Sequence, residues 1–217
     1  MKLKNTLKRF FLWFDMAVLD HGFLRFFYHN FHKIDEKLYR SNMPTPSRIR
    51  KYKNLGIKTI INLRGGRNGA LLLENEACSK YNINLINLVA RSRAAPDKKM
   101  INEINEIFNK IEYPALIHCK SGADRAGIVA ALYQLLYCNE PIEIAKKQLS
   151  IKFLHIKWAK TGILDKFFDE YDDYNNQNNE IHFLTWVNKH YDPVKLENNF
   201  KSNRFFNLFL EKFLRRE

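Results

Sequence analysis

Residues 114–127 read PALIHCKSGADRAG, and this stretch decides the fold that we expect. The apolar run 114–118 predicts a buried strand, and the apolar run 126–137 predicts a helix. Residues 119–125 then form a tight loop that leads from the strand into the helix. Backbone N–H groups of such a loop converge at the helix N-terminus, where the helix dipole adds positive potential. The stretch therefore predicts a cradle for an anion.

The residue types in this loop suit attack on a phosphate ester. Positive potential stabilises a thiolate, which is the nucleophilic form of cysteine, so we expect Cys119 to be the nucleophile. The planar fork of Arg125 can hold two phosphoryl oxygens and stabilise the charge that builds up on them. His118 is expected to orient the loop through hydrogen bonds. The predicted phosphate-binding residues are Lys120, Ser121, Gly122, Ala123, Asp124 and Arg125.

Strands and helices alternate on either side of this stretch. Strands are predicted at 58–63 and 83–89, and helices at 70–81 and 97–111. This order predicts a single α/β domain with a mostly parallel central sheet flanked by helices. Further helices are expected from about 141 to 174 and from 179 to 191, joined by the polar residues 175–179.

The cysteine loop resembles the active-site signature of the protein tyrosine phosphatase superfamily, His-Cys-x5-Arg. The loop lengths are similar to those of its dual-specificity branch, and more narrowly to a bacterial group. The resemblance covers about residues 38–174 and includes YRSNMPTP from Tyr39 and INLRGG from Ile61. It implies a phosphoric monoester hydrolase in which the cysteine forms a phosphocysteine that water then hydrolyses. It also implies that no metal and no cofactor is used.

Such a phosphatase also needs a general acid for the leaving oxygen. Asp97 is the first candidate, because it lies where the family's acid loop is expected; it could equally cap the helix that follows. Asp124 is the second, because Cys-x4-Asp-Arg loops resemble those of myotubularin-type and Sac-type phosphoinositide phosphatases. There it could act as the acid, contact a polyol headgroup or simply brace the loop.

Three further positions bear on substrate and turnover. Lys120 resembles a loop lysine that meets an extra phosphate in phosphoinositide phosphatases, although it could be a solvated lysine. Arg91 and Arg93 could bind a second anionic group or be ordinary loop charges. Ala126 stands where many family members have Ser or Thr, which suggests slow hydrolysis of the intermediate.

The two ends of the chain differ from its centre. We expect a basic, aromatic N-terminal helical segment at 1–33, a phosphatase domain at 34–174 and a C-terminal helical extension at 175–217. Such end helices either lie in a membrane interface or pack on the domain. The net charge of +13 favours anionic partners. Three cysteines without disulfide or metal-site spacing predict a cytoplasmic protein, peripheral at the inner membrane surface if the ends bind lipid.

These observations favour hydrolysis of a phosphate monoester on a lipid headgroup. The main alternative is a protein tyrosine or dual-specificity phosphatase with the same mechanism. An RNA 5′-triphosphatase and a non-catalytic phosphate-binding module are further alternatives, but the sequence offers no stacking platform or RNA-binding motif, so nucleic acid is not an expected partner. The partners expected are a phosphorylated lipid or phosphoprotein and an anionic membrane surface.

Overall fold

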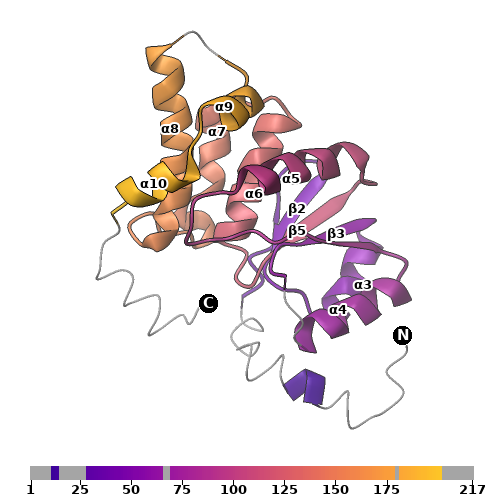
Figure 1. Ribbon diagram of the computed structural model, residues 1–217. Coiled ribbons are helices and arrows are strands. Elements are labelled where there is room, and N and C mark those ends of the chain that lie inside the picture. Colours follow the sequence, from indigo (N-terminus) through magenta and orange to yellow (C-terminus); the bar gives the residue numbers. More distant parts are fainter. Residues whose placement is uncertain (1–10, 15–27, 66–68, 179–180, 202–217) are drawn as a thin grey trace. The chain divides into compact units, whose positions relative to one another are not determined.

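The computed structural model in Figure 1 describes residues 11–14, 28–65, 69–178 and 181–201. The chain divides into two compact units, which are described in turn. The first comprises Met1–Val89 and Ile111–Gly122, and the second comprises Ala90–Lys110 and Ala123–Glu217.

The first unit contains a sheet that, in the part of the chain described, has five strands in the order β1-β2-β5-β3-β4. Their bounds are β1 His32–Lys33, β2 Leu38–Ser41, β3 Thr59–Asn62, β4 Asn84–Asn87 and β5 Ala115–His118. Only β1 is antiparallel to its neighbour, and the other pairs are parallel. Every residue of the central strand β5 is buried, which explains why it appears in the sequence as an unbroken apolar run.

Two helices of this unit, α3 (Pro46–Asn54) and α4 (Gly69–Lys80), pack on the sheet (Figure 1). One apolar cluster joins them to it, and its members are Ile49 and Tyr52 of α3, Ala77 and Cys78 of α4, Ile60 of β3, Leu116 of β5, and Ile57 and Ile83. Helix α3 begins with two sequence signals: the Thr45 hydroxyl accepts the N–H of Arg48, and Pro46 occupies the first turn.

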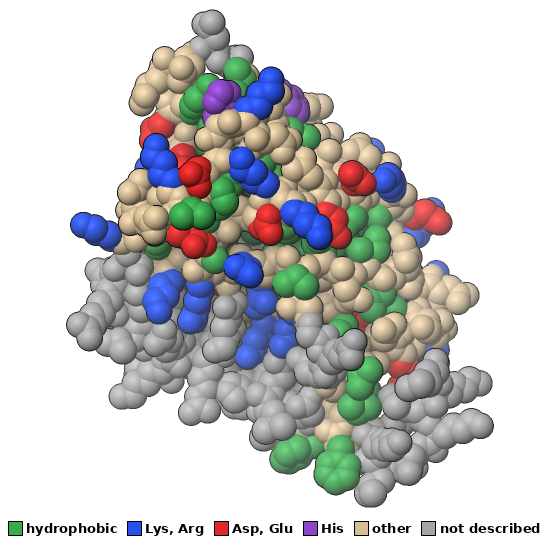
Figure 2. Space-filling model, in the orientation of Figure 1, with side chains coloured by type: hydrophobic (Ala, Val, Ile, Leu, Met, Phe, Trp, Pro, Cys, Tyr) green, Lys and Arg blue, Asp and Glu red, His purple; other side chains and the backbone are tan. Residues whose placement is uncertain are grey.

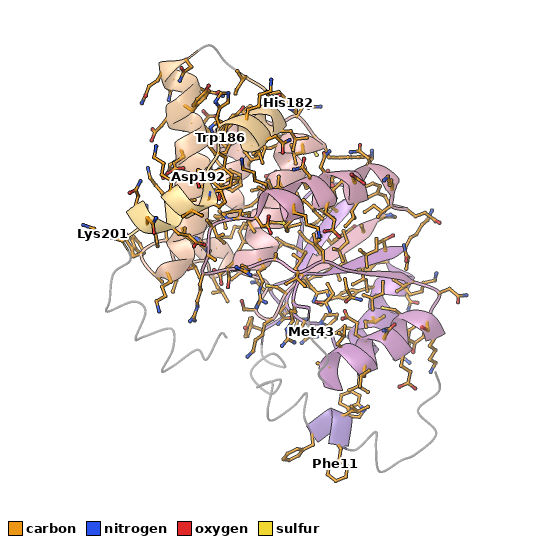
Figure 3. The ribbon with its side chains drawn as sticks, viewed as in Figure 1. Phe11, Met43, His182, Trp186, Asp192 and Lys201 are labelled. Carbon is orange, nitrogen blue, oxygen red and sulfur yellow. The ribbon has the colours of Figure 1, made fainter. Side chains whose placement is uncertain are left out.

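The second unit is helical. Its elements are α5 Lys98–Lys110, α6 Asp124–Leu136, α7 Ile142–Ala145, η2 Lys146–Gln148, η3 Ile151–Phe153, η4 Lys160–Gly162, α8 Ile163–Gln177, α9 Phe183–Lys189 and α10 Pro193–Asn199. An aromatic core joins α8 to α9: the Phe167 ring centroid lies 5.6 Å from that of Trp186 and 4.8 Å from that of Tyr191. Figure 3 shows Trp186 among the helices of this unit. Helices α5 and α6 meet through Phe108 and Tyr133.

The predicted α/β class with a mostly parallel sheet and flanking helices is confirmed. Three details of the prediction were wrong. Helix α6 begins at Asp124, so the first turn of this helix includes the end of the predicted loop. The stretch 141–162 consists of short helical turns, because the backbone leaves the right-handed helical region at Leu149, Ser150, Leu154 and Ala159. Helix α8 continues to Gln177, into the predicted polar connection.

Most of the predicted end segments lies outside the described residues. Residues 11–14 are helical, and Leu12 and Trp13 pack against Met43, Ala70 and Leu73. Phe11 is exposed, and Figure 3 shows its ring directed away from Met43. No helix within the described ranges is long and apolar enough to cross a bilayer. The three-segment division of the chain stays a prediction.

Candidate phosphate-binding site

Cys119 follows the last residue of β5 and is buried. Its Sγ lies 3.2 Å from the backbone nitrogen of Gly122, whose N–H donates to the sulfur. Gly122 has φ 76°, and a Cβ there would lie 2.7 Å from the backbone carbon of Ser41. Only glycine fits this position, since any side chain would meet fixed backbone. The chain therefore folds back tightly enough to aim a backbone N–H at the thiol.

The carbonyls of the same loop accept hydrogen bonds from β2 and from residues that come before and after it in the chain. Arg40, a fully buried residue of β2, donates from Nη2 to the Gly122 carbonyl at 2.8 Å. Asn30 Nδ2 donates to the Ser121 carbonyl at 2.9 Å, and the Met43 N–H donates to the Lys120 carbonyl at 3.3 Å. Because C=O and N–H point in opposite directions across a trans peptide, these bonds turn the loop N–H groups away from β2. That orientation suits an anion cradle.

His118 is held by a buried carboxylate. Its Nε2 lies 2.7 Å from Glu74 Oε1, and both side chains are inaccessible to solvent. The other Glu74 oxygen accepts from Asn62 Nδ2 at 3.0 Å. His118 Nδ1 lies 3.4 Å from the Cys119 carbonyl. Sequence reasoning did not find Glu74 or Asn62, although a glutamate between apolar residues of α4 is a signal that it needs a partner.

The second half of the predicted loop begins α6, and there Asp124 is engaged by a residue that the sequence did not suggest. Nδ1 of the buried His155 lies 2.8 Å from Asp124 Oδ1, and its Nε2 lies 2.7 Å from Asp165 Oδ2. Burial lowers the pKa of His155, but hydrogen bonds to the two carboxylates and their charges outweigh it and raise the pKa to about 9. His155 is therefore a cation between two anions at neutral pH.

Asp97 lies directly before α5 and is exposed. Its Oδ1 accepts the N–H of Lys99 at 2.8 Å. Asp97 therefore caps α5, which is one of the two roles expected for it. The residues before it are anchored within the second unit: the Tyr191 hydroxyl donates to the Pro96 carbonyl, and the Ala95 N–H donates to Glu197. Asp97 therefore stands on a fixed loop with its carboxylate accessible to solvent.

Arg125 lines a cavity of about 280 Å³ in the second unit. The other lining residues are Ala90, Arg91, Ser92, Arg93 and Ala94. Three guanidinium-bearing residues around one space, with no carboxylate lining it, create a positive potential that favours an anionic ligand. The two arginines that the sequence left open thus share a cavity with the predicted phosphate-binding arginine.

The remaining cysteines differ from each other. Cys78 is buried, and its burial, with the charge of Glu74, raises the pKa of its thiol. Cys138 follows the end of α6 and is only partly buried. Among the residues that the structure describes, no His, Cys, Asp and Glu cluster has a geometry that could hold a metal ion.

Two comparisons with known structures show the fold. The crystal structure of TpbA from Pseudomonas aeruginosa superposes with a TM-score of 0.55 at 16% identity, covering 78% of this chain and 89% of that one. The crystal structure of PTPMT1 gives a TM-score of 0.51 at 16% identity, covering 68% of this chain and 99% of that one.

Comparison of sequences is more specific than comparison of structures, because it bears on the family as well as on the fold. The curated dual specificity protein phosphatase TpbA of Pseudomonas aeruginosa strain UCBPP-PA14 is 23% identical over 108 residues, which are 49% of this chain and 47% of TpbA. The chain thus spans about half the length of the curated relatives that it matches. A family model described as tyrosine phosphatase family matches residues 27–138, a range that contains both Cys119 and Arg125. This confirms the predicted enzyme class at the level of family: the chain belongs to the tyrosine phosphatase family.

Proposed function

We propose that the chain is a cysteine-dependent phosphatase in which residues 119–125 bind the phosphate. The observation that carries this proposal is the N–H of Gly122 directed at Cys119 Sγ, 3.2 Å between nitrogen and sulfur. A donor in this position stabilises a thiolate more than a thiol, because a hydrogen bond to a charged acceptor is stronger. The same donor stabilises negative charge on a phosphoryl group as the sulfur–phosphorus bond forms.

The proposed reaction has two steps. The Cys119 thiolate attacks phosphorus, the ester bond breaks, and the leaving oxygen takes a proton from a general acid. Water then attacks the phosphocysteine and passes a proton to the carboxylate that donated one in the first step, the sulfur–phosphorus bond breaks, and inorganic phosphate leaves with the thiolate and the acid restored. Arg125 would neutralise charge on the phosphoryl oxygens in both steps.

We assign the acid role to Asp97 and a bracing role to Asp124. The Asp97 carboxylate is exposed and stands on an anchored loop. The Asp124 carboxylate accepts from a buried histidine whose raised pKa keeps it charged, so proton donation from Asp124 would break this contact. A bracing Asp124 also keeps its oxygens from a polyol headgroup.

For the substrate we propose a phosphorylated lipid headgroup. The cavity lined by Arg91, Arg93 and Arg125 supports a ligand with a second anionic group beside the phosphate that is cleaved, as phospholipid headgroups have. Lys120 is a further candidate contact. The alternative is a phosphoprotein, and a specific observation favours it: a TpbA variant with the same fold has been crystallised in complex with pTyr.

Phosphate release from a substrate panel tests the proposal, with Cys119→Ser as the blank. The panel contains phosphoinositides, phosphatidylglycerophosphate and lipid A phosphates in anionic vesicles, together with phosphotyrosine peptides and a soluble aryl phosphate. A tenfold preference for one lipid, ~1.4 kcal/mol in transition-state binding, supports the lipid assignment. A preference for peptides supports the alternative, and activity that survives in Cys119→Ser refutes the mechanism.

A further inference from the structure

A short surface segment of the second unit exposes large apolar side chains. This segment, residues 151–158, is called the η3 loop here. Ile151 is 69% exposed, Leu154 42% and Trp158 52%. Such side chains scattered singly need no explanation, but three of them within one short segment make this segment a candidate contact surface.

The η3 loop is rigid rather than disordered. Leu154 has φ 67°, in the left-handed region that a leucine rarely adopts. Backbone bonds hold this turn: the Leu154 N–H donates to the Ile151 carbonyl at 2.8 Å, and the His155 N–H donates to the Ser150 carbonyl at 3.1 Å. Phe153 and His155 are buried, so alternate side chains anchor the loop while their neighbours point outward. At its far end, Gly162 approaches the Lys157 backbone so closely that no side chain would fit there.

The charges of the loop are all positive. The sequence from Ile151 to Trp158, IKFLHIKW, contains two lysines and no acidic residue, and Lys160 follows shortly after it. Lys152 Nζ lies 5.3 Å from the Phe153 ring centroid, and Lys157 Nζ lies 5.5 Å from that of Trp158. More widely, Figure 2 shows Lys and Arg side chains gathered below the position of α10, with few Asp or Glu among them. Protein–protein interfaces are depleted in lysine, whereas lysine beside tryptophan and aliphatic residues is typical of membrane interfaces.

The η3 loop is also connected to the proposed phosphate site. His155 lies within the loop, and its ring contacts Asp124, the residue directly before Arg125. The His155–Asp124 contact lies within the second unit, and Phe153 is buried there as well. The η3 loop and the first turn of α6 therefore belong to the same compact unit. A surface bound by the loop would therefore lie at a fixed position relative to Arg125.

We propose that the η3 loop seats the protein on an anionic membrane surface. Ile151, Leu154 and Trp158 enter the boundary between headgroups and acyl chains, and Lys152 and Lys157 contact the lipid phosphates. Binding to lipid does not depend on catalysis. Its consequence, that a lipid headgroup is presented to Arg125, rests on the proposed function.

Vesicle binding by the full chain tests this proposal. The probes are vesicles of phosphatidylcholine alone and of phosphatidylcholine with phosphatidylglycerol, measured by co-sedimentation at low and high salt. We expect Ile151→Ser with Trp158→Ala to weaken binding to the anionic vesicles at least tenfold. Lys152→Glu with Lys157→Glu should remove most of the salt-sensitive part of the binding.

Matched controls carry the same chemical changes elsewhere. Val194→Ser alters another exposed apolar residue, and Lys51→Glu with Lys189→Glu removes the same charge from α3 and α9. The loop is supported as the contact surface if the control variants bind anionic vesicles like the wild type while the loop variants bind them more weakly. Equal weakening by controls and loop variants, or unchanged binding by the loop variants, overturns it.

Tryptophan quenching by brominated lipid locates the contact independently of stability. Trp158→Phe keeps an apolar ring but should lose most of the quenching, whereas Trp13→Phe should retain it. Quenching that persists in Trp158→Phe and disappears in Trp13→Phe assigns the contact to the N-terminal segment and refutes the proposal. Hydrolysis of the soluble aryl phosphate is measured in parallel and should be unchanged in the loop variants. If the wild type binds vesicles but never hydrolyses this ester, the membrane surface stands and the proposed function fails.

Discussion

Replacing His155 with glutamine tests how much the buried Asp124–His155–Asp165 cluster stabilises the protein. Glutamine preserves polarity and approximate size but carries no charge. The carboxylate of Asp124 is almost inaccessible to solvent, and that of Asp165 is mostly so. Without a positive charge between them, the two carboxylates repel each other in a region of low polarity. Removing one partner of a buried pair of this kind costs about 3–5 kcal/mol.

The raised pKa of His155 gives a second, pH-dependent measure of the same contacts. The shift from 6.5 to about 9 corresponds to about 3 kcal/mol, since one unit equals about 1.36 kcal/mol. Because the pKa is raised in the folded state, this stabilisation is fully present below pH 6.5. It is lost as the pH rises towards about 9, where the folded histidine itself loses its proton.

Urea unfolding between pH 6 and pH 9.5 measures both effects. The difference in unfolding free energy between wild type and His155→Gln should shrink by about 3 kcal/mol from pH 6.5 to pH 9. Subtracting the variant removes contributions from Cys78, whose raised pKa also lowers stability at alkaline pH. His182→Gln, at an exposed position, is the matched control and should unfold like the wild type. A difference that stays constant across this range refutes the charged-histidine interpretation.

Three further changes probe the phosphate-binding residues. Gly122→Ala would place a Cβ against the backbone at Ser41, at a φ that alanine rarely adopts. We therefore expect the free energy of unfolding in urea to fall by about 1–3 kcal/mol and inhibition by vanadate to weaken. Unchanged values would contradict the close approach of Gly122 to the Ser41 backbone. Asp97→Asn should cut turnover about 100-fold for alkyl phosphates and little for activated aryl phosphates, and this pattern in Asp124→Asn instead would overturn the acid assignment. Arg91→Gln with Arg93→Gln should raise KM about tenfold for a substrate with two phosphates but leave KM for an aryl monophosphate unchanged; equal effects on both would exclude a second-anion site.

The parts of the site that could be predicted are those that local physics determines. The strand that became β5 is apolar because it is the central strand of the sheet and buried on both faces. Gly122 was predicted as a phosphate-binding residue because a residue without a side chain lets the backbone approach a phosphate, and the structure shows in addition a positive φ and a close approach to the backbone of Ser41. Cys119 and Arg125 could be selected because they flank that turn at the spacing of a known signature.

The parts that could not be predicted depend on contacts between distant segments. His155 was indistinguishable in the sequence from an ordinary histidine, since its partner Asp124 is 31 residues away and a helix followed by several short turns separates the two. The boundary of α6 was placed too late because Asp124 and Arg125 are polar and resemble loop residues. Arg40 lies in the stretch YRSNMPTP that resembles the family, but its role could not be predicted, because a buried arginine in a strand is explained only by the carbonyl to which it donates.

The buried thiol of Cys78 bears on how this protein can be labelled. Alkylating reagents and peroxide react with the thiolate, and a pKa raised by burial keeps Cys78 protonated throughout the physiological range. In the folded protein, iodoacetate should therefore spare Cys78 and modify the partly exposed Cys138. It should also modify Cys119, which is buried too but whose thiolate we propose the Gly122 N–H stabilises. In a Cys138→Ser background, the mass added per chain would count the molecules whose Cys119 is reactive, which gives an active-site titration that requires no knowledge of the natural substrate.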